Sequence, residues 1–129
     1  MPHYVILTHD HPFPHWDLLL ETGEACRTWR LLGEPGCNRE IAAEPLPDHR
    51  LLYLDYEGPV SGDRGSVERW DRGTYIIVSE TADSLVVLLD GERGLGRGCL
   101  SRAGGGECWQ FQASEFDSSR EVNRPRDGG

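Results

Sequence analysis

Two histidines and an aspartate near the start of the chain, His9, His15 and Asp17, have the types and spacing of a metal-binding group. Alternate side chains of a strand project to opposite faces, so a strand over residues 15–21 would place His15 and Asp17 on one face. His9 ends the preceding apolar run and can approach the same face if the two strands pair. Two imidazoles and one carboxylate suit a divalent ion that keeps open positions for water and substrate. Spacing alone also allows a loop cluster of histidines, His11 included, that binds nothing.

A second polar cluster brings His49 and Tyr53 close together in the sequence. A strand is predicted over residues 51–57, with Tyr53 on one of its faces and His49 just before its start. The alternative is an exposed histidine at the entrance of a strand, followed by an ordinary strand tyrosine. The residue types alone leave both interpretations open.

Short strand patterns separated by turn residues must position these clusters. Trp16, Leu18 and Leu20 alternate with the polar side chains of the first cluster and are expected in a core. The strand candidates are residues 4–8, 15–21, 26–32, 51–57, 66–70, 74–80, 84–89, 98–102 and 107–112. Asp90-Gly91 predicts a tight hairpin turn, because glycine supplies the positive φ of such turns. The pattern predicts an all-β or mainly β fold, a small antiparallel β-barrel-like domain with short helical or loop segments.

The totals fit one globular domain of 129 residues, of which 37% are hydrophobic and 27% charged. We expect residues 1–113 to form this domain and residues 114–129 to form a disordered tail. No apolar run is long enough to span a bilayer, and the N-terminus lacks the pattern of a signal peptide. A cytoplasmic protein without membrane contact is therefore expected. The four cysteines form no Cys-x-x-Cys pair and are interpreted as buried thiols, with structural zinc as the alternative.

The net charge of −9 limits the class of partner. A protein that holds long duplex DNA through its phosphates is usually basic. An acidic chain acts on a small ligand, or it holds a nucleic-acid end through a local site.

Three segments of the chain fit ordered motifs. The pattern His-x5-His-x-Asp-x-Arg-x-Glu is matched, except at its arginine, by His9, His15, Asp17 and Glu21. The pattern Asp-His-Pro-Leu-x-Tyr-x-x-Phe-Glu-Gly is matched by Asp48, His49, Leu51, Tyr53, Tyr56, Glu57 and Gly58. The pattern Gly-x-Val-Glu-x-Trp-Asp-x-Gly-Thr is matched by Gly65, Val67, Glu68, Trp70, Asp71, Gly73 and Thr74. In their order and spacing these segments resemble the 3′-phosphoesterase domain of bacterial DNA ligase D and its free-standing relatives, over about residues 4–112.

The resemblance implies a β-barrel-like core and a metal-dependent enzyme of DNA repair. It implies a manganese ion, with zinc or cobalt as alternatives, held by His9, His15 and Asp17. It implies removal of a phosphate or a terminal ribonucleoside from DNA or RNA 3′ ends. His49 and Tyr53 would contact the scissile phosphate as catalytic residues. Further substrate contacts are expected from Arg39, Arg50 and Glu21. A monomer is expected, with a ligase or polymerase as a partner supplied in trans.

Several positions depart from the family pattern. The lysine that usually follows the tryptophan strand has no counterpart in residues 31–34, and the basic residue before the second motif has no clean equivalent. Leu19 stands where the family has its arginine, and Leu7 stands where the family often has glutamine. Leucine cannot replace the bidentate contact of arginine with a phosphate. Other arginines could rebuild the anion site, and the candidates are Arg27, Arg30, Arg39 and Arg50. The alternatives to an enzyme are a module that binds a metal or a nucleic-acid end, and an interaction domain with a decayed site.

Overall fold

The computed structural model describes residues 2–36 and 38–114, and these residues form one antiparallel sheet of nine strands. The strands are β1 (His3–His9), β2 (His15–Glu21), β3 (Ala25–Leu31), β4 (Ile41–Arg50), β5 (Gly58–Pro59), β6 (Ser66–Thr81), β7 (Ser84–Gly91), β8 (Gly96–Arg102) and β9 (Trp109–Ser114). One short 3-10 helix, η1 (Leu51–Leu54), follows β4. The all-β, β-barrel-like prediction is therefore confirmed for the described residues.

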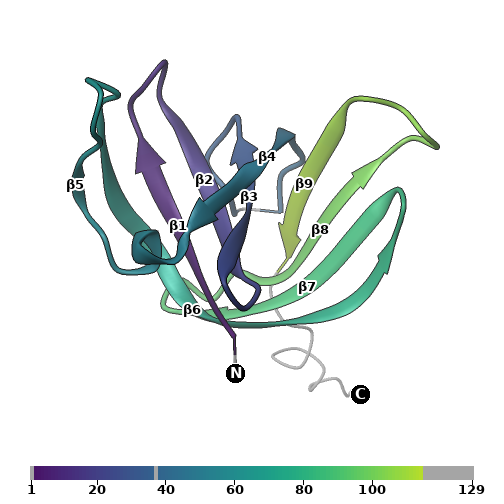
Figure 1. Cartoon of the computed structure of the whole chain (residues 1–129). Coiled ribbons are helices and arrows are strands. Elements are labelled where there is room, and N and C mark those ends of the chain that lie inside the picture. Colours follow the sequence, from purple (N-terminus) through teal and green to yellow (C-terminus); the bar gives the residue numbers. More distant parts are fainter. Residues whose placement is uncertain (1, 37, 115–129) are drawn as a thin grey trace.

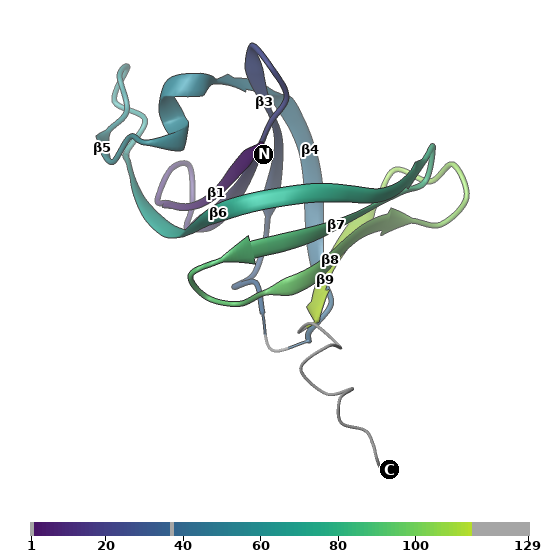
Figure 2. The ribbon, with the colours of Figure 1, turned by 90° about the horizontal axis from the view of Figure 1, so that it is seen from below.

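The sheet closes into a ring from two antiparallel meanders (Figure 1). Strands β1 to β4 form one meander, and β6 to β9 form the other. They join at two seams, where β1 pairs with β6 and β4 pairs with β9. The first seam is long, from His3 opposite Thr74 to His9 opposite Val67, whereas the second joins residues 41–43 to 109–111. Figure 2 shows β6 extending past β1 on one side while it pairs with β7 on the other.

A large apolar core fills the ring, because alternate side chains of each strand point inward. On β1 and β2 the inward residues are Tyr4, Ile6, Leu18 and Leu20, all fully buried. Trp16 packs against the same core, as the alternation of residues 15–21 predicts. These inward residues fix the outward direction of the polar residues between them.

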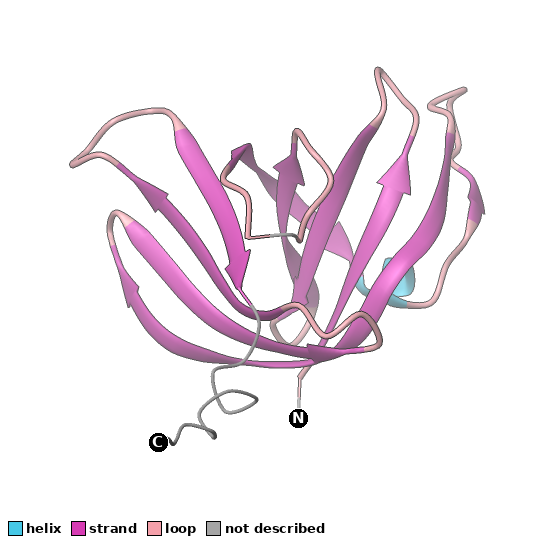
Figure 3. Ribbon diagram, turned by 180° about the vertical axis from the view of Figure 1, so that it is seen from behind, coloured by secondary structure: helices cyan, strands magenta, loops and turns pink. Residues whose placement is uncertain are grey.

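A second, smaller apolar cluster covers part of the outer face of β1 and β2. Its buried members are Val5, Leu7, Leu19, Cys26 and Val67. The segment from η1 to β5 lies over them and contributes Leu51, Tyr53, Leu54, Tyr56 and Val60. Figure 3 shows η1 beside the strands that it covers. One end of the outer face is therefore apolar and closed by this segment.

The predicted strand over residues 51–57 is wrong, because this stretch begins with η1. A 3-10 turn brings residues three apart to one side, so Leu51 and Leu54 both pack on the second cluster. The strand before it, β4, was not predicted; it contains Pro45 and Pro47, which lack the backbone N–H of a regular strand. The separate candidates 66–70 and 74–80 are one continuous strand, β6.

The predicted hairpin is present, because β7 and β8 are antiparallel neighbours, but Asp90-Gly91 is not its turn. Both residues lie in β7, and the left-handed glycines come later, at Gly94 and Gly96. Gly91 is required for close packing instead, since a Cβ there would lie 2.1 Å from the Tyr4 hydroxyl oxygen. Of the predicted tail 114–129, Ser114 ends β9 and the rest lies outside the described residues. No helix in the described part of the chain has the length and apolar character to cross a bilayer.

Candidate metal centre

His9, His15 and Asp17 meet on the outer face of the β1–β2 hairpin, at the end that the second apolar cluster leaves free. In the register of the two strands, His9 is paired directly with His15, and their ring centroids lie 4.9 Å apart. Asp17 follows on the same face of β2. His15 and Asp17 are each only 2% exposed, and His9 is half-buried. The outer-face position predicted from the alternation of β2 is therefore the one that the structure has.

Backbone carbonyls fix the protonation of both imidazoles. A carbonyl oxygen can only accept, so the ring nitrogen that faces it must carry the proton. His15 Nδ1 donates to the Phe13 carbonyl at 2.7 Å. His9 Nε2 donates to the Arg64 carbonyl at 2.9 Å. In the neutral imidazoles the remaining nitrogens, His15 Nε2 and His9 Nδ1, therefore present lone pairs.

Both lone pairs face the carboxylate of Asp17. His15 Nε2 lies 3.1 Å from Asp17 Oδ1, and His9 Nδ1 lies 3.2 Å from Asp17 Oδ2. His15 Nε2 and Asp17 Oδ1 are buried and have no hydrogen-bond partner among the described residues. Two acceptors in contact repel each other unless a proton or a metal ion lies between them.

The group fits a divalent cation. One ligand atom from each of the three residues lies within 4.8 Å of the others. Ligands about 2.1 Å from a central ion lie roughly 3 to 3.5 Å from one another, which is the range of the His–Asp separations. The carbonyls that accept the outer N–H of each histidine are typical supports of metal-ligating imidazoles. Within residues 2–36 and 38–114 this is the one group of three side chains that meets these conditions.

The pKa of His15 reports the same contact. Burial lowers the pKa of His15, but the hydrogen-bonding and charge of the Asp17 carboxylate raise it more, and the net direction is above 6.5. A proton therefore competes with any metal ion for the position between the two side chains.

The triad opens into a pocket of about 610 Å³. Besides the triad, the side chains that line this pocket include His49, Arg50 and Tyr53, and also Arg30 and Arg64. His49 Nδ1 donates to the Pro47 carbonyl at 3.1 Å, which leaves Nε2 as the free ring nitrogen. Tyr53 packs on the second apolar cluster, with its ring centroid 5.8 Å from that of His49. The two motif segments around residues 9–21 and 48–58 thus contribute to one pocket.

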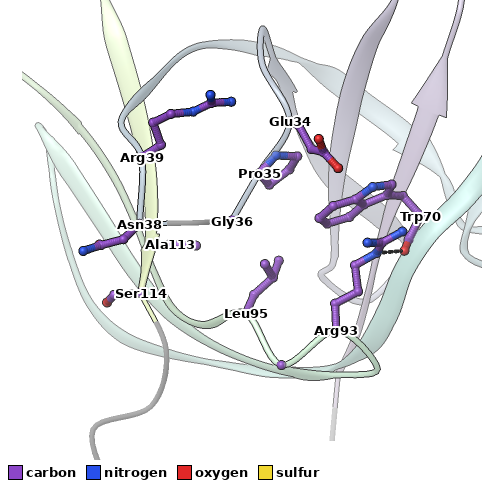
Figure 4. Close-up of a pocket in the computed structure, with 11 residues that line it drawn as sticks. Glu34, Pro35, Gly36, Asn38, Arg39, Trp70, Arg93, Leu95, Ala113 and Ser114 are labelled. Carbon is purple, nitrogen blue, oxygen red and sulfur yellow. Dashed lines mark hydrogen bonds between the residues drawn. The ribbon is translucent and has the colours of Figure 1, made fainter.

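Two predicted substrate residues lie elsewhere. Arg39 lines a different pocket of about 580 Å³, where Figure 4 shows it on the opposite side from Trp70, with Pro35 between them. Glu21 lies at the other end of β2 from His15 and accepts a hydrogen bond from the backbone N–H of His3 at 2.8 Å. This hydrogen bond, followed by the contact with the His3 ring, lowers the pKa of Glu21. The structure does not bring these two side chains to the triad.

Position 19, where the family pattern has arginine, is filled by a fully buried leucine. Leu19 and Leu7 both belong to the second apolar cluster, beneath the segment that contains η1. Leu7 lines the triad pocket with apolar atoms only, and Leu19 is not among the residues that line it. Position 19 therefore contributes packing, and no polar group, to this face of the sheet.

The third motif has an architectural role in this structure. Gly65 has a φ of +75°, and a Cβ there would lie 2.1 Å from Asp10 Oδ1. Asp10 in turn accepts the backbone N–H of Ser66 at 2.9 Å, which ties the β1–β2 loop to the start of β6. Asp71 is buried and accepts hydrogen bonds from Tyr4 and from the backbone of Arg93. The motif therefore holds the β1–β6 seam that supports the triad.

Three groups of this site were not predicted from the sequence. The Arg64 carbonyl supports His9 from a loop far along the chain, and a backbone group has no residue type by which to recognise it. The Phe13 carbonyl is local, and its position two residues before His15 is a signal that could have been used. The side chain of Arg64 was missed as well, although Arg64 is one of the residues that line the pocket.

Fold and site together define a class: a closed antiparallel sheet that carries two histidines and one aspartate on its outer face, in an arrangement that fits a divalent cation. The chain matches the family model of the DNA ligase D 3′-phosphoesterase domain over residues 7–102. The chain therefore belongs to this family, and a phosphoesterase of DNA repair is its type of function. A search of curated proteins found no match to the chain.

Proposed function

We propose that this chain is a divalent-metal-dependent phosphoesterase that removes a 3′-phosphate or a terminal ribonucleoside from DNA or RNA ends. Manganese is the expected ion, with zinc and cobalt as alternatives. One observation carries the proposal: two imidazole lone pairs and a buried carboxylate face one another without a hydrogen-bond donor. Family membership supports the substrate class.

His9, His15 and Asp17 are the proposed ligands of the ion. When bound, a divalent ion would neutralise the negative charge that develops on the phosphoryl oxygens during the reaction. The Phe13 and Arg64 carbonyls hold the two imidazoles in the tautomers and orientations that ligation needs. Burial of His15 and Asp17 keeps water from the inner side of the site.

His49 and Tyr53 are the proposed catalytic residues. The Nδ1 proton of His49 is held by the Pro47 carbonyl, so Nε2 is the nitrogen available to a substrate in the shared pocket. An imidazole can exchange a proton near neutral pH, which suits protonation of a leaving oxygen. Tyr53 supports this imidazole by its edge-on contact and offers a hydroxyl to the phosphate.

Binding without hydrolysis is the second candidate function. Burial of Leu19 under the second apolar cluster favours it, because position 19 offers no cation to the phosphate. Such a module would hold the metal and a nucleic-acid end for a partner. The two candidates differ in one observable, the release of product.

The remaining parts of the proposal concern context. A single domain over residues 1–113 would act as a cytoplasmic monomer on DNA or RNA 3′ ends. A ligase or polymerase supplied in trans would use the cleaned end. The DNA-repair character of the family supports this arrangement.

The test uses a primer–template that ends in a 3′-phosphate or in a single 3′-ribonucleotide, with and without Mn²⁺. The proposal expects trimming by the wild type only with the ion, and loss of trimming in His15→Ala. His3→Ala is the matched control, because His3 is an exposed histidine that contacts Glu21 outside the pocket. Its trimming rate should equal that of the wild type.

Two results would change the conclusion. Mn²⁺ binding by the wild type without trimming of either substrate would favour the binding module. Mn²⁺-dependent trimming that survives in His15→Ala would refute the assigned ligands.

A further inference from the structure

Positive side chains gather at the triad pocket, although the whole chain has a net charge of −9. Arg30, Arg50 and Arg64 line the pocket, against the two carboxylates of Asp17 and Asp48. A divalent ion at the triad would raise this local excess of positive charge further. An anion of more than one charge is the ligand that such a pocket complements.

Arg30 lies closest in register to the triad. On β3 it is the direct cross-strand partner of Asp17, so both side chains project from the outer face. Its side chain is 23% exposed, and its Nε is buried without a hydrogen-bond partner among the described residues. Its ion-pair contact is a long one, 3.6 Å from Nη1 to Glu44 Oε1, and Glu44 is 51% exposed. A buried guanidinium N–H of this kind calls for an acceptor, and residues 2–36 and 38–114 do not provide one.

Arg30 does not neutralise Asp17 directly. Both oxygens of Asp17 face histidine nitrogens, at 3.1 and 3.2 Å. A guanidinium beside a cation site weakens the binding of the cation, because the two positive charges repel each other. An anion bound between the two positive groups reverses this repulsion, so the cation and the anion should favour each other's binding.

Arg64 provides a second cation at the pocket. Its Nε donates to the Ser61 carbonyl at 2.7 Å, and its Nη2 donates to Ser61 Oγ at 3.3 Å. These contacts hold the guanidinium in place before any ligand arrives. Its own carbonyl supports His9, so one residue connects the metal ligand and the pocket.

We propose that Arg30 and Arg64 form an anion subsite beside the triad that takes the dianion of a phosphomonoester. Arginine suits this ligand because its planar N–H groups pair with phosphate oxygens. The other arginines on β3 and in the β3–β4 loop do not serve, since Arg27 pairs with Glu80 and Arg39 lines another pocket. The inference rests on the proposed function for its metal partner, but its anion contact can be measured alone.

The test titrates inorganic phosphate into the full chain, with Mn²⁺ by calorimetry and without metal by NMR of the arginine Nε–H resonances. In Arg30→Gln the affinity for phosphate should fall about tenfold or more, and in Arg30→Lys by a smaller factor. The affinity for Mn²⁺ without phosphate should stay equal or rise, because a repelling charge is removed. Arg27→Gln is the matched control on the same strand, and its phosphate affinity should stay within about twofold of the wild type.

Several results would overturn the proposal. Unchanged phosphate affinity in Arg30→Gln would do so, and so would a loss of Mn²⁺ affinity in the absence of phosphate, which would make Arg30 a support of Asp17. If Arg30→Gln does not fold, equal phosphate affinity in Arg30→Lys and wild type would decide against a guanidinium contact. Oligonucleotides that end in a 3′-hydroxyl or in a 3′-phosphate can be compared as competitors of inorganic phosphate. If both compete equally well, the subsite binds backbone phosphates and not a terminal phosphomonoester. A wild type that binds no Mn²⁺ would refute the proposed function, while the metal-free titration would still decide the role of Arg30.

Discussion

Asp17 and Asp71 are both almost fully buried on strands of the same sheet, 2% and 1% exposed, yet their surroundings are opposite. Asp71 receives a donor on each oxygen, the Tyr4 hydroxyl at 2.6 Å and the Arg93 backbone N–H at 3.0 Å. Asp17 faces one nitrogen of each imidazole. When the rings are neutral, the single N–H of each ring is on the other nitrogen, where it donates to a backbone carbonyl. Burial is nearly the same for both carboxylates. The presence of donors marks Asp71 as a carboxylate that holds the fold, whereas their absence at Asp17 among the described residues leaves surroundings that fit a cation.

The largest expected effect is the loss of metal affinity in the Asp17→Asn variant. We expect the affinity for Mn²⁺ to fall by about a hundredfold or more, because a charged ligand is lost. The metal-free protein should be as stable as the wild type or more stable, since the amide can donate to an imidazole lone pair. Calorimetry and urea unfolding in EDTA measure the two quantities. A large loss of metal-free stability would make Asp17 a structural carboxylate like Asp71.

Asp71→Asn should have the reverse profile. We expect this substitution to lower the free energy of unfolding by about 2 kcal/mol. Each oxygen of Asp71 now accepts a hydrogen bond, and in the asparagine one of them is replaced by an NH₂ group, which would face a donor. Affinity for Mn²⁺ should remain within about twofold of the wild type. Urea unfolding and calorimetry on the same preparation check both, and equal stability of variant and wild type would contradict the assigned role.

Tyr4→Phe tests the donor side of the Asp71 network. Removing the hydroxyl should cost about 1 to 2 kcal/mol at neutral pH, since one oxygen of Asp71 loses its donor. Burial, followed by the hydrogen bond to Asp71, raises the pKa of Tyr4 above 10.0. A raised pKa contributes stability that is full below the unfolded value and declines as the pH rises above it. The difference in the free energy of unfolding between wild type and Tyr4→Phe should therefore narrow above about pH 10. A difference that stays constant across this pH range would contradict the assigned hydrogen bond.

Asp83 extends the comparison to an exposed carboxylate with two donors and gives the smallest effect. The backbone N–H of Gly105 first, and the guanidinium of Arg102 second, lower the pKa of Asp83 below 3.8. A lowered pKa contributes stability above the unfolded value that is lost as the pH falls through the folded value. Asp83→Asn should slightly flatten the acid side of the stability profile, and solvent screening keeps the change small. NMR titration of the Asp83 carboxyl group measures its pKa, and a pKa that is not lowered would contradict the prediction.

The sequence predicted the parts of the molecule that follow from a strand's alternation. The faces of β2 and the all-β fold are of this kind, because inward Leu18 and Leu20 determine where His15 and Asp17 point. Strand β4 was missed because Pro45 and Pro47 conceal its pattern. The 3-10 helix was predicted as a strand because the apolar run that begins at Leu51 has no period of its own.

The candidate site was accessible from sequence only in its side chains. The supporting carbonyls, the burial of Leu19 and the approach of Arg30 to Asp17 all depend on which strands pair and in what register. Register across strands distant in sequence is set by the packing of the whole sheet, and no local pattern specifies it.

The Arg64 carbonyl, which orients His9, has a consequence for folding. The β1–β2 hairpin is local and can form early, whereas the β1–β6 seam joins segments that are far apart in the chain and closes at a greater cost in chain entropy. His9 acquires its support only when that seam is closed. A cation that binds only the completed triad therefore favours the closed ring by mass action. The N-terminal strand would then be the part of the sheet whose attachment depends most on the supply of metal ions.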